Sequence, residues 1–123
     1  MRAAVMLLYD YLGVLNSALV HSPDSQLIRD LRKLGETALD GSRLGIVVVP
    51  DEERFAIRFN GKSFALMPDE PPVALVWRAP RDYLERVIDD PSAFIDQPER
   101  LDWDWLWAAA TAEARPAHPD GDS

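Results

Sequence analysis

The amino-acid sequence predicts an α+β domain, with an antiparallel-rich sheet of about five strands and helices packed on one face of it. Two observations carry this prediction. Apolar residues recur at a helical period of about 3.6 up to residue 39, and at the strand period of 2 from Arg43 onward. A chain of 123 residues that is 47% hydrophobic also has the usual size and composition of one globular core. We therefore expect a single domain over residues 1–114.

The first predicted helix spans residues 3–20, AAVMLLYDYLGVLNSALV, and is apolar almost all round. Asp10 and Asn16 are the main exceptions. A helix of this kind has to be covered on more than one side, so it belongs to a core or to an interface. A secretory signal is not expected, because Asp10 interrupts the apolar run and no small-residue cleavage pattern follows it. No stretch reaches the ~18 uninterrupted apolar residues of a membrane span.

A second helix is predicted over residues 23–39. Ser22 supplies a capping hydroxyl ahead of it, Pro23 suits its first turn, and Asp40-Gly41 ends it. Its apolar stripe, which should face the core, consists of Leu27, Ile28, Leu31, Leu34 and Ala38.

Four strands follow, in the segments RLGIVVV, RFAIRF, KSFALM and PVALVWR. Asn60-Gly61 is typical of a two-residue hairpin turn, because both central residues of a type I′ turn need positive φ. Together with a four-residue loop over 50–53, this turn puts the apolar side chains of three strands on one face. The predicted pairs are Phe59 with Lys62, Ile57 with Phe64, Phe55 with Leu66, Val48 with Phe55, Ile46 with Ile57 and Leu44 with Phe59. The fourth strand could pair with the third or cross to the first, and the pattern does not decide between them.

The opposite face of the predicted sheet is mixed in polarity. We therefore expect it to be partly covered, for example by a second subunit. Its polar members are Arg43, Arg54, Arg58, Ser63 and Arg78, and its apolar members are Val47, Val49, Ala56, Ala65 and Val76.

The C-terminal third is predicted to be mainly helical. Ala79-Pro80 opens a helix that runs to about Ile88, and Asp90-Pro91 opens a short second one that carries Phe94. Residues 100–107 fit both an alternating strand and a helical stripe, and we favour a short fifth strand that passes into a C-terminal helix. The acidic, proline-rich tail at 115–123 is expected to be disordered.

Charge and composition exclude several classes of function. The formal net charge is −8 and only two lysines are present, which argues against nucleic acid or an anionic bilayer as a partner. The absence of cysteine excludes thiolate metal sites and a cysteine nucleophile. It also agrees with a reducing compartment, so we expect a cytoplasmic protein. No cofactor and no metal are expected.

We expect no catalytic centre in this chain. Of its two histidines, His118 falls in the predicted disordered tail and His21 lies at a helix junction, so neither is held as rigidly as a catalytic group must be. Asp102-Trp103-Asp104 has the form of a short acidic metal-binding motif. Without a glycine-rich phosphate loop or a basic cluster, the simpler interpretation is two solvated aspartates that alternate with core tryptophans.

With this order of elements, the chain resembles the sterol carrier protein two family over about residues 22–110. The segments that carry the resemblance are GSRLGIVVV, RFAIRFNGKSFALM, PPVALVWRAPRDYLERVIDDPSAF and the closing RLDWDW. The resemblance implies a non-catalytic domain that holds fatty acids, acyl-CoA, sterols or isoprenoid lipids between its sheet and its helices. The chain departs from the family pattern at residues 95–99, where IDQPE replaces a glycine-rich segment, and in lacking the Gly-Asp that usually follows the fifth strand.

Two hypotheses about function follow. In the first, the domain binds a lipid or another hydrophobic small molecule in a cavity over the inward face of the sheet. In the second, aromatic rings fill that space, and the domain is an interaction or scaffold module. It would then dimerise or dock a partner protein through the apolar helix of residues 3–20 and the mixed sheet face. The cavity of the first hypothesis would be lined by Phe64, Leu66, Leu75, Trp77, Leu84, Ile88, Phe94 and Trp103.

Overall fold

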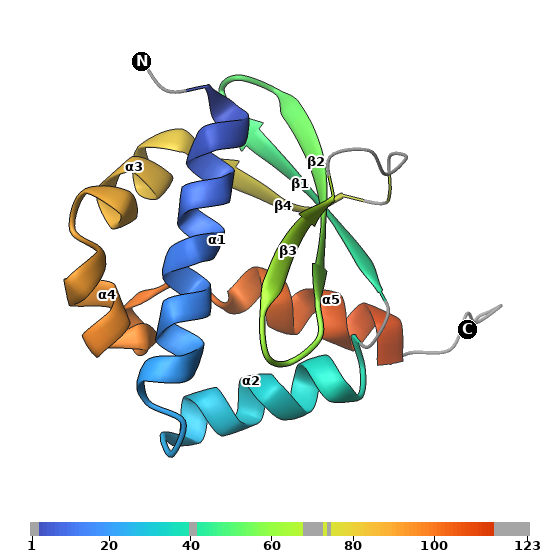
Figure 1. Ribbon diagram of the computed structural model, residues 1–123. Helices are drawn as coiled ribbons and strands as arrows, with labels where there is room; N and C mark the ends of the chain where they lie inside the picture. The colour runs from blue at the N-terminus through green and yellow to red at the C-terminus, as the bar shows by residue number, and fades with distance from the viewer. Residues whose placement is uncertain (1–2, 40–41, 68–72, 74, 115–123) are drawn as a thin grey trace, which may run out of the picture.

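The computed structural model describes residues 3–39, 42–67, 73 and 75–114, and it confirms the α+β class. Two helices precede four strands, and the remaining helices follow them (Figure 1). The elements are α1 (Ala4–His21), α2 (Gln26–Glu36), β1 (Arg43–Val49), β2 (Glu53–Phe59), β3 (Phe64–Met67), β4 (Leu75–Pro80), α3 (Arg81–Asp89), α4 (Pro91–Asp96), the 3₁₀ turn η1 (Pro98–Arg100) and α5 (Asp104–Ala114).

The four strands form one mixed sheet in the order β3-β2-β1-β4. β1 is antiparallel to β2, and β2 to β3, whereas β1 and β4 run parallel. The fourth strand therefore crosses to the first, one of the two possibilities that the sequence left open. The prediction of an antiparallel-rich sheet of about five strands is wrong in both respects, since the described sheet has four strands and one of its three pairings is parallel.

The fifth strand predicted over residues 100–107 is replaced by the start of a helix. The N–H groups of Leu106 and Trp107 donate to the carbonyl oxygen of Trp103, so this backbone is hydrogen-bonded locally and not to β4. The side chain of Asp102 accepts a hydrogen bond from the N–H of Asp104, where α5 begins. The apparent alternation arises because a bend passes into a helix here. Alternate side chains on both sides of that junction happen to point inward, and these are Leu101, Trp103 and Trp105.

The pairing of β2 with β3 differs by two residues from the predicted register. Phe59 pairs with Phe64, and Ile57 with Leu66, because the connection covers residues 60–63 and not only Asn60-Gly61. The side-chain oxygen of Asn60 accepts hydrogen bonds from the N–H groups of residues 62 and 63, which closes this longer turn. Gly61 does adopt positive φ, at 91°.

The register of β1 against β2 is also shifted by two, with Leu44 opposite Ile57, Ile46 opposite Phe55 and Val48 opposite Glu53. A shift of two leaves every side chain on the same face of a strand, whereas a shift of one would reverse it. The predicted inward face is therefore confirmed. Its fully or largely buried members are Leu44, Ile46, Val48, Ile57, Phe59 and Phe64.

The reverse face of the sheet carries the predicted arginines, all of them exposed. Arg78 forms an ion pair with Glu52 at 2.7 Å. Val47 is nonetheless buried, and the register places it between Arg54 on one side and Arg78 on the other. The burial of Val47 agrees with the expectation that this face is partly covered. Val47 is already buried within a single chain, without a second subunit.

Helix α2 is shorter than predicted at both ends. Ser25, and not Ser22, caps it by accepting a hydrogen bond from the N–H of Ile28 at 3.2 Å. Its last turn packs against the β2–β3 turn so closely that a Cβ on Gly35 would lie 2.1 Å from the backbone nitrogen of Gly61. The predicted stop at residues 40–41 and the predicted disordered tail at 115–123 lie outside the described residues.

The two helices predicted after β4 are confirmed, with α3 beginning at Arg81 and α4 at Pro91. Arg81 is nearly buried, with a side chain that is 10% exposed, and it anchors the start of α3. It forms an ion pair at 2.6 Å with Asp51 in the β1–β2 loop and a second at 3.3 Å with Glu85 one helical turn on. This pairing ties α3 to the end of the sheet where β1 turns into β2.

Candidate functional site

The space between sheet and helices holds a cluster of aromatic side chains. Trp77 of β4 stacks on Trp105 of α5, with ring centroids 4.9 Å apart and an angle of 5° between the planes. Phe64 of β3 stacks on Phe59 at 4.2 Å and lies 6.4 Å from Trp103. The rings thus pack against one another from β2 and β3 to the far edge of the sheet. Three of the residues predicted to line a cavity, Phe64, Trp77 and Trp103, are brought together here.

The other residues predicted to line a cavity are more dispersed. Leu84 is fully buried. The guanidinium carbon of Arg100 lies over the ring of Phe94, 5.1 Å from the centroid of that ring. Leu75, Ile88 and Leu66 are half-buried.

A tyrosine pair joins α1 to α3 beside the tryptophans. The hydroxyls of Tyr11 and Tyr83 are hydrogen-bonded at 3.1 Å, and the N–H of Asp102 donates to Tyr83 at 2.8 Å. Burial, and after it the neighbouring phenol, raises the pKa of Tyr11 well above its ordinary value, and burial also raises the pKa of Tyr83. Both phenols are therefore neutral, and the pair serves to position α1.

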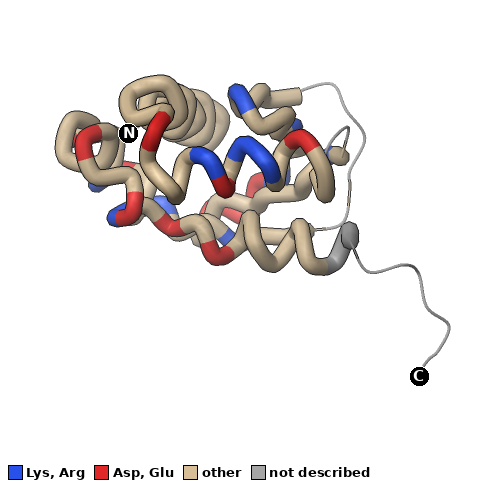
Figure 2. The backbone as a smooth tube through the Cα atoms, turned by 90° about the horizontal axis from the view of Figure 1, so that it is seen from below, with Lys and Arg blue, Asp and Glu red and all other residues tan. Residues whose placement is uncertain are grey.

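The outer face of α1 is apolar and exposed to solvent. The four large apolar side chains that are exposed among the described residues all belong to this helix: Val5 (37%), Met6 (53%), Tyr9 (63%) and Val20 (68%). Between its ends at Ala4 and His21 the helix carries one aspartate and no lysine or arginine. It lies in front of the other elements in Figure 1, and its tube in Figure 2 is tan over most of its length, in contrast to α2.

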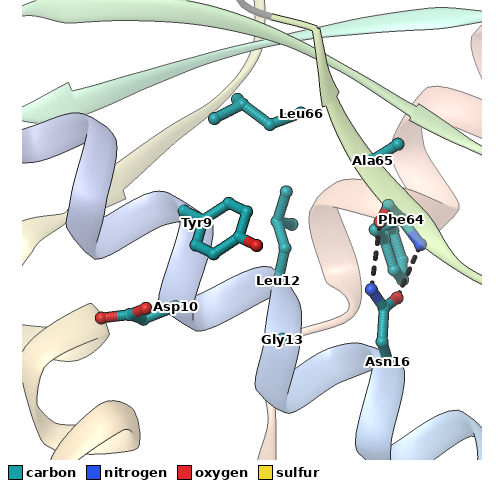
Figure 3. Close-up of a pocket in the computed structure, with 8 residues that line it drawn as sticks. All are labelled: Tyr9, Asp10, Leu12, Gly13, Asn16, Phe64, Ala65 and Leu66. Carbon is teal, nitrogen blue, oxygen red and sulfur yellow. Dashed lines mark hydrogen bonds between the residues drawn. The ribbon is translucent and has the colours of Figure 1, made fainter.

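A groove of about 460 Å³ lies between α1 and the edge strand β3 (Figure 3). It passes over Gly13, where a Cβ would meet no atom within 4 Å, so the missing side chain contributes to the hollow. Tyr9 and Leu66 project toward one another across it. The groove is lined by Tyr9, Asp10, Leu12, Gly13, Asn16, Phe64, Ala65 and Leu66.

Asn16 closes one end of this groove. Its Oδ1 accepts a hydrogen bond from the N–H of Phe64 at 2.6 Å, and its Nδ2 donates to the carbonyl oxygen of the same residue at 3.1 Å (Figure 3). The side-chain amide therefore replaces a neighbouring strand at the edge of the sheet, where an unpaired backbone would otherwise be exposed. These two hydrogen bonds link α1 directly to β3.

The side chains of His21 and Asp102, considered as candidate catalytic or metal-binding groups, each have a partner in the structure. His21 pairs with Asp96 at 3.2 Å on the surface, and Asp102 holds the start of α5. Over the described ranges, no group of three histidine or acidic side chains is arranged to hold a metal ion.

Helix α1 is long and apolar enough to cross a membrane by length and composition alone, yet half of its residues are buried in the domain. That burial is typical of the core helix of a folded domain.

Sequence reasoning named the helix of residues 3–20 as a docking element, but it missed the groove and did not tell which face of α1 is exposed. It identified Phe64 and Leu66, but not Tyr9, Gly13 or Asn16, because a helix that is apolar all round gives no contrast between its faces. The signal that was available is that the small or polar residues Gly13, Asn16 and Ser17 fall on one side of the helix.

Comparison of the chain with protein-family models, with curated proteins and with solved structures found no match.

Proposed function

We propose that this protein is a non-catalytic interaction module that docks an apolar helix of a protein partner on the outer face of α1. One observation carries the proposal: the four large apolar side chains exposed among the described residues share this single helix. Apolar residues scattered over a surface are ordinary, whereas several on one face of a single element favour an interaction site. Val5, Met6 and Tyr9 lie near the start of α1 and Val20 near its end.

The chemistry of this face favours a protein helix over a membrane. An anionic bilayer attracts lysine and arginine beside an apolar helix, and α1 has neither, in a chain of net charge −8. The hollow over Gly13 lets a second helix approach α1 closely, and the groove beside it has room for that helix's side chains. Docking of an amphipathic helix in an apolar groove is a common mode of recognition.

Photo-crosslinking in the cells that make the protein tests this proposal. A benzophenone amino acid replaces Tyr9 or Val20 on the docking face, and Ala108, exposed on α5, in a matched control. We expect protein adducts from the two α1 positions and none from position 108. Absence of adducts at both α1 positions, or equal adducts at all three, would show that α1 is not the docking face.

A second candidate function is the binding of a hydrophobic small molecule, as the resemblance to lipid carriers implies. The observation that favours it is the groove itself, whose volume of about 460 Å³ lies within the range of ligand pockets. Its apolar lining includes Phe64 and Leu66, both expected from the sequence, together with Leu12. The lining contains the carboxylate of Asp10 and no basic residue, so a neutral isoprenoid or sterol would be favoured over a fatty acid or acyl-CoA.

Titration with a neutral isoprenoid alcohol and with a fatty acid of similar length tests this candidate. A ligand that binds only the folded state raises the free energy of unfolding by roughly 2.7 kcal/mol at a hundred times its dissociation constant. We expect the alcohol to produce this rise and Leu66→Thr to weaken it, whereas Val76→Thr, half-buried in β4, should not. Tighter binding of the fatty acid, or equal effects of the two variants, would place the ligand elsewhere.

A further inference from the structure

We infer that the helix docked on α1 is α1 of a second copy of this chain, packed antiparallel with the two helices crossing at Gly13. This inference rests on the proposed function and names its partner. It starts from the outer face, where the exposed residues Met6, Tyr9, Gly13, Ser17 and Val20 follow one another at steps of 3, 4, 4 and 3 residues. Such steps place all five along one seam of the helix, on the face that the domain leaves uncovered.

The outer face is symmetric about Gly13. Met6 and Val20 each lie seven residues from it, and Tyr9 and Ser17 each lie four residues from it. A two-fold axis through Gly13 therefore places Met6 against Val20 of the other copy, and Tyr9 against Ser17. All of these residues are exposed in the domain. A face that docks on itself must be self-complementary in this way, as in any two-fold interface.

The antiparallel orientation follows from size and charge. In parallel packing Tyr9 would meet its own copy, and the carboxylates of Asp10 would lie at the same level. In antiparallel packing the large ring of Tyr9 lies over the small Ser17. The two Asp10 side chains are then separated by six helical residues, about 9 Å along the axis. The absence of side chain at Gly13 allows the backbones to approach at the crossing.

Preorganisation also favours a second copy. Two copies of net charge −8 repel each other, and this repulsion opposes the dimer; it is smallest where the facing residues carry no charge, as along this seam. Two heptads form a short coiled coil, but this helix does not have to fold on binding, because nine of its residues are already buried in its own domain. A preformed helix avoids most of the ordering cost of association.

Sedimentation velocity of the full chain over a wide concentration range tests the inference. We expect the wild-type chain to pass from monomer to dimer. Gly13→Glu should weaken the dimer at least about tenfold, because it places two like charges at the crossing. Ala108→Glu, with the same change of charge on another exposed helix, should leave the dimer unchanged. Circular dichroism should show both variants folded, since nothing occupies the space beside Gly13.

The register is tested by cysteine cross-linking, since the natural chain contains no cysteine. We expect Gly13→Cys to form a disulfide-linked dimer by itself. Met6→Cys should not do so alone, but it should link to Val20→Cys when the two proteins are mixed. A disulfide between two copies of the Met6→Cys chain would contradict the antiparallel register.

A chain that stays monomeric at every concentration, or a dimer that Gly13→Glu leaves intact, would overturn the inference. If the inference of a dimer fails, the mass of the photo-crosslinked adducts shows whether the proposed docking face fails with it. Adducts of twice the chain mass support a second copy. Adducts of another mass from Tyr9 and Val20 leave the docking face in place and show that its partner is a different protein.

Discussion

Two helical glycines in this chain should respond in opposite ways to the same substitution. Gly35 of α2 faces the β2–β3 turn, where a Cβ would lie 2.1 Å from the nitrogen and 2.4 Å from the Cα of Gly61. Gly13 of α1 faces open space. Alanine is favoured over glycine inside a helix by about 1 kcal/mol, so Gly13→Ala should raise the free energy of unfolding by about that amount.

Gly35→Ala should lower the free energy of unfolding. The new methyl group meets backbone atoms, which cannot rotate away as a flexible side chain could, so α2 or the turn has to shift by more than 1 Å to restore an ordinary contact near 3.4 Å. Overpacking of this kind typically costs about 1–3 kcal/mol or more, which exceeds the helical preference for alanine, a gain that is smaller in the last turn. We expect a net loss of about 2 kcal/mol.

Urea unfolding followed by tryptophan fluorescence measures both effects, at concentrations low enough for the chain to be monomeric. The midpoint should rise for Gly13→Ala and fall for Gly35→Ala, with similar slopes. An unchanged or higher midpoint for Gly35→Ala would refute the close packing of α2 on the hairpin. A lower midpoint for Gly13→Ala would refute the open space beside α1.

Three further predictions concern single polar groups. Asn16→Leu leaves the backbone N–H and carbonyl of Phe64 without their partner, so the free energy of unfolding should fall by about 1–3 kcal/mol. Hydrogen exchange of the Phe64 amide should also accelerate, and an unchanged exchange rate would contradict the pairing. Asp51→Ala removes the shorter ion pair of the nearly buried Arg81 and should lower the free energy of unfolding, measured in urea, by about 1–3 kcal/mol. An unchanged free energy of unfolding would mean that Arg81 is solvated. Because the folded-state pKa of Tyr11 is raised, its contribution to stability is complete below pH ~10 and is lost as the pH rises further, when the unfolded chain ionises first. Tyr11→Phe should flatten that alkaline loss, and an equally steep loss in the variant would assign it to other groups.

The faces of the strands were predictable from the sequence, and the pairing of the strands was not. A period of 2 determines which side chains share a face, and this holds for any even shift of register. The register itself depends on how the turn closes. Asn60-Gly61 predicts a two-residue turn, but the side chain of Asn60 bonds to two N–H groups further along and stabilises a connection of four residues. Local propensity was correct about the turn and wrong about its length.

Residues 100–107 illustrate a second limit. Their alternation of tryptophan and aspartate fits a strand, yet the decisive interactions are local hydrogen bonds of Asp102 and Trp103 that begin α5. Alternation over only four apolar residues, Leu101, Trp103, Trp105 and Trp107, cannot distinguish a strand from a bend that runs into a helix.

The candidate site lies on the helix that was least informative in sequence. The buried stripe of α1 is apolar, and its exposed seam carries large apolar side chains too, so composition alone indicated cover on more than one side without telling which side. Only the packing of the domain against Leu8, Tyr11 and Leu15 shows which face remains uncovered. An uncovered apolar face is what an interaction module needs, and it follows from tertiary structure.

Hydroxyl-radical footprinting of the unmodified chain tests the docking of α1 most directly. Met6 and Tyr9 are both readily oxidised, and they are 53% and 63% exposed in the isolated domain. We predict that both become protected as the protein concentration rises or when the protein is labelled inside cells, while Met67, half-buried at the end of β3, keeps a constant rate. Oxidation of Met6 and Tyr9 at the rate of the dilute monomer under every condition would contradict the account.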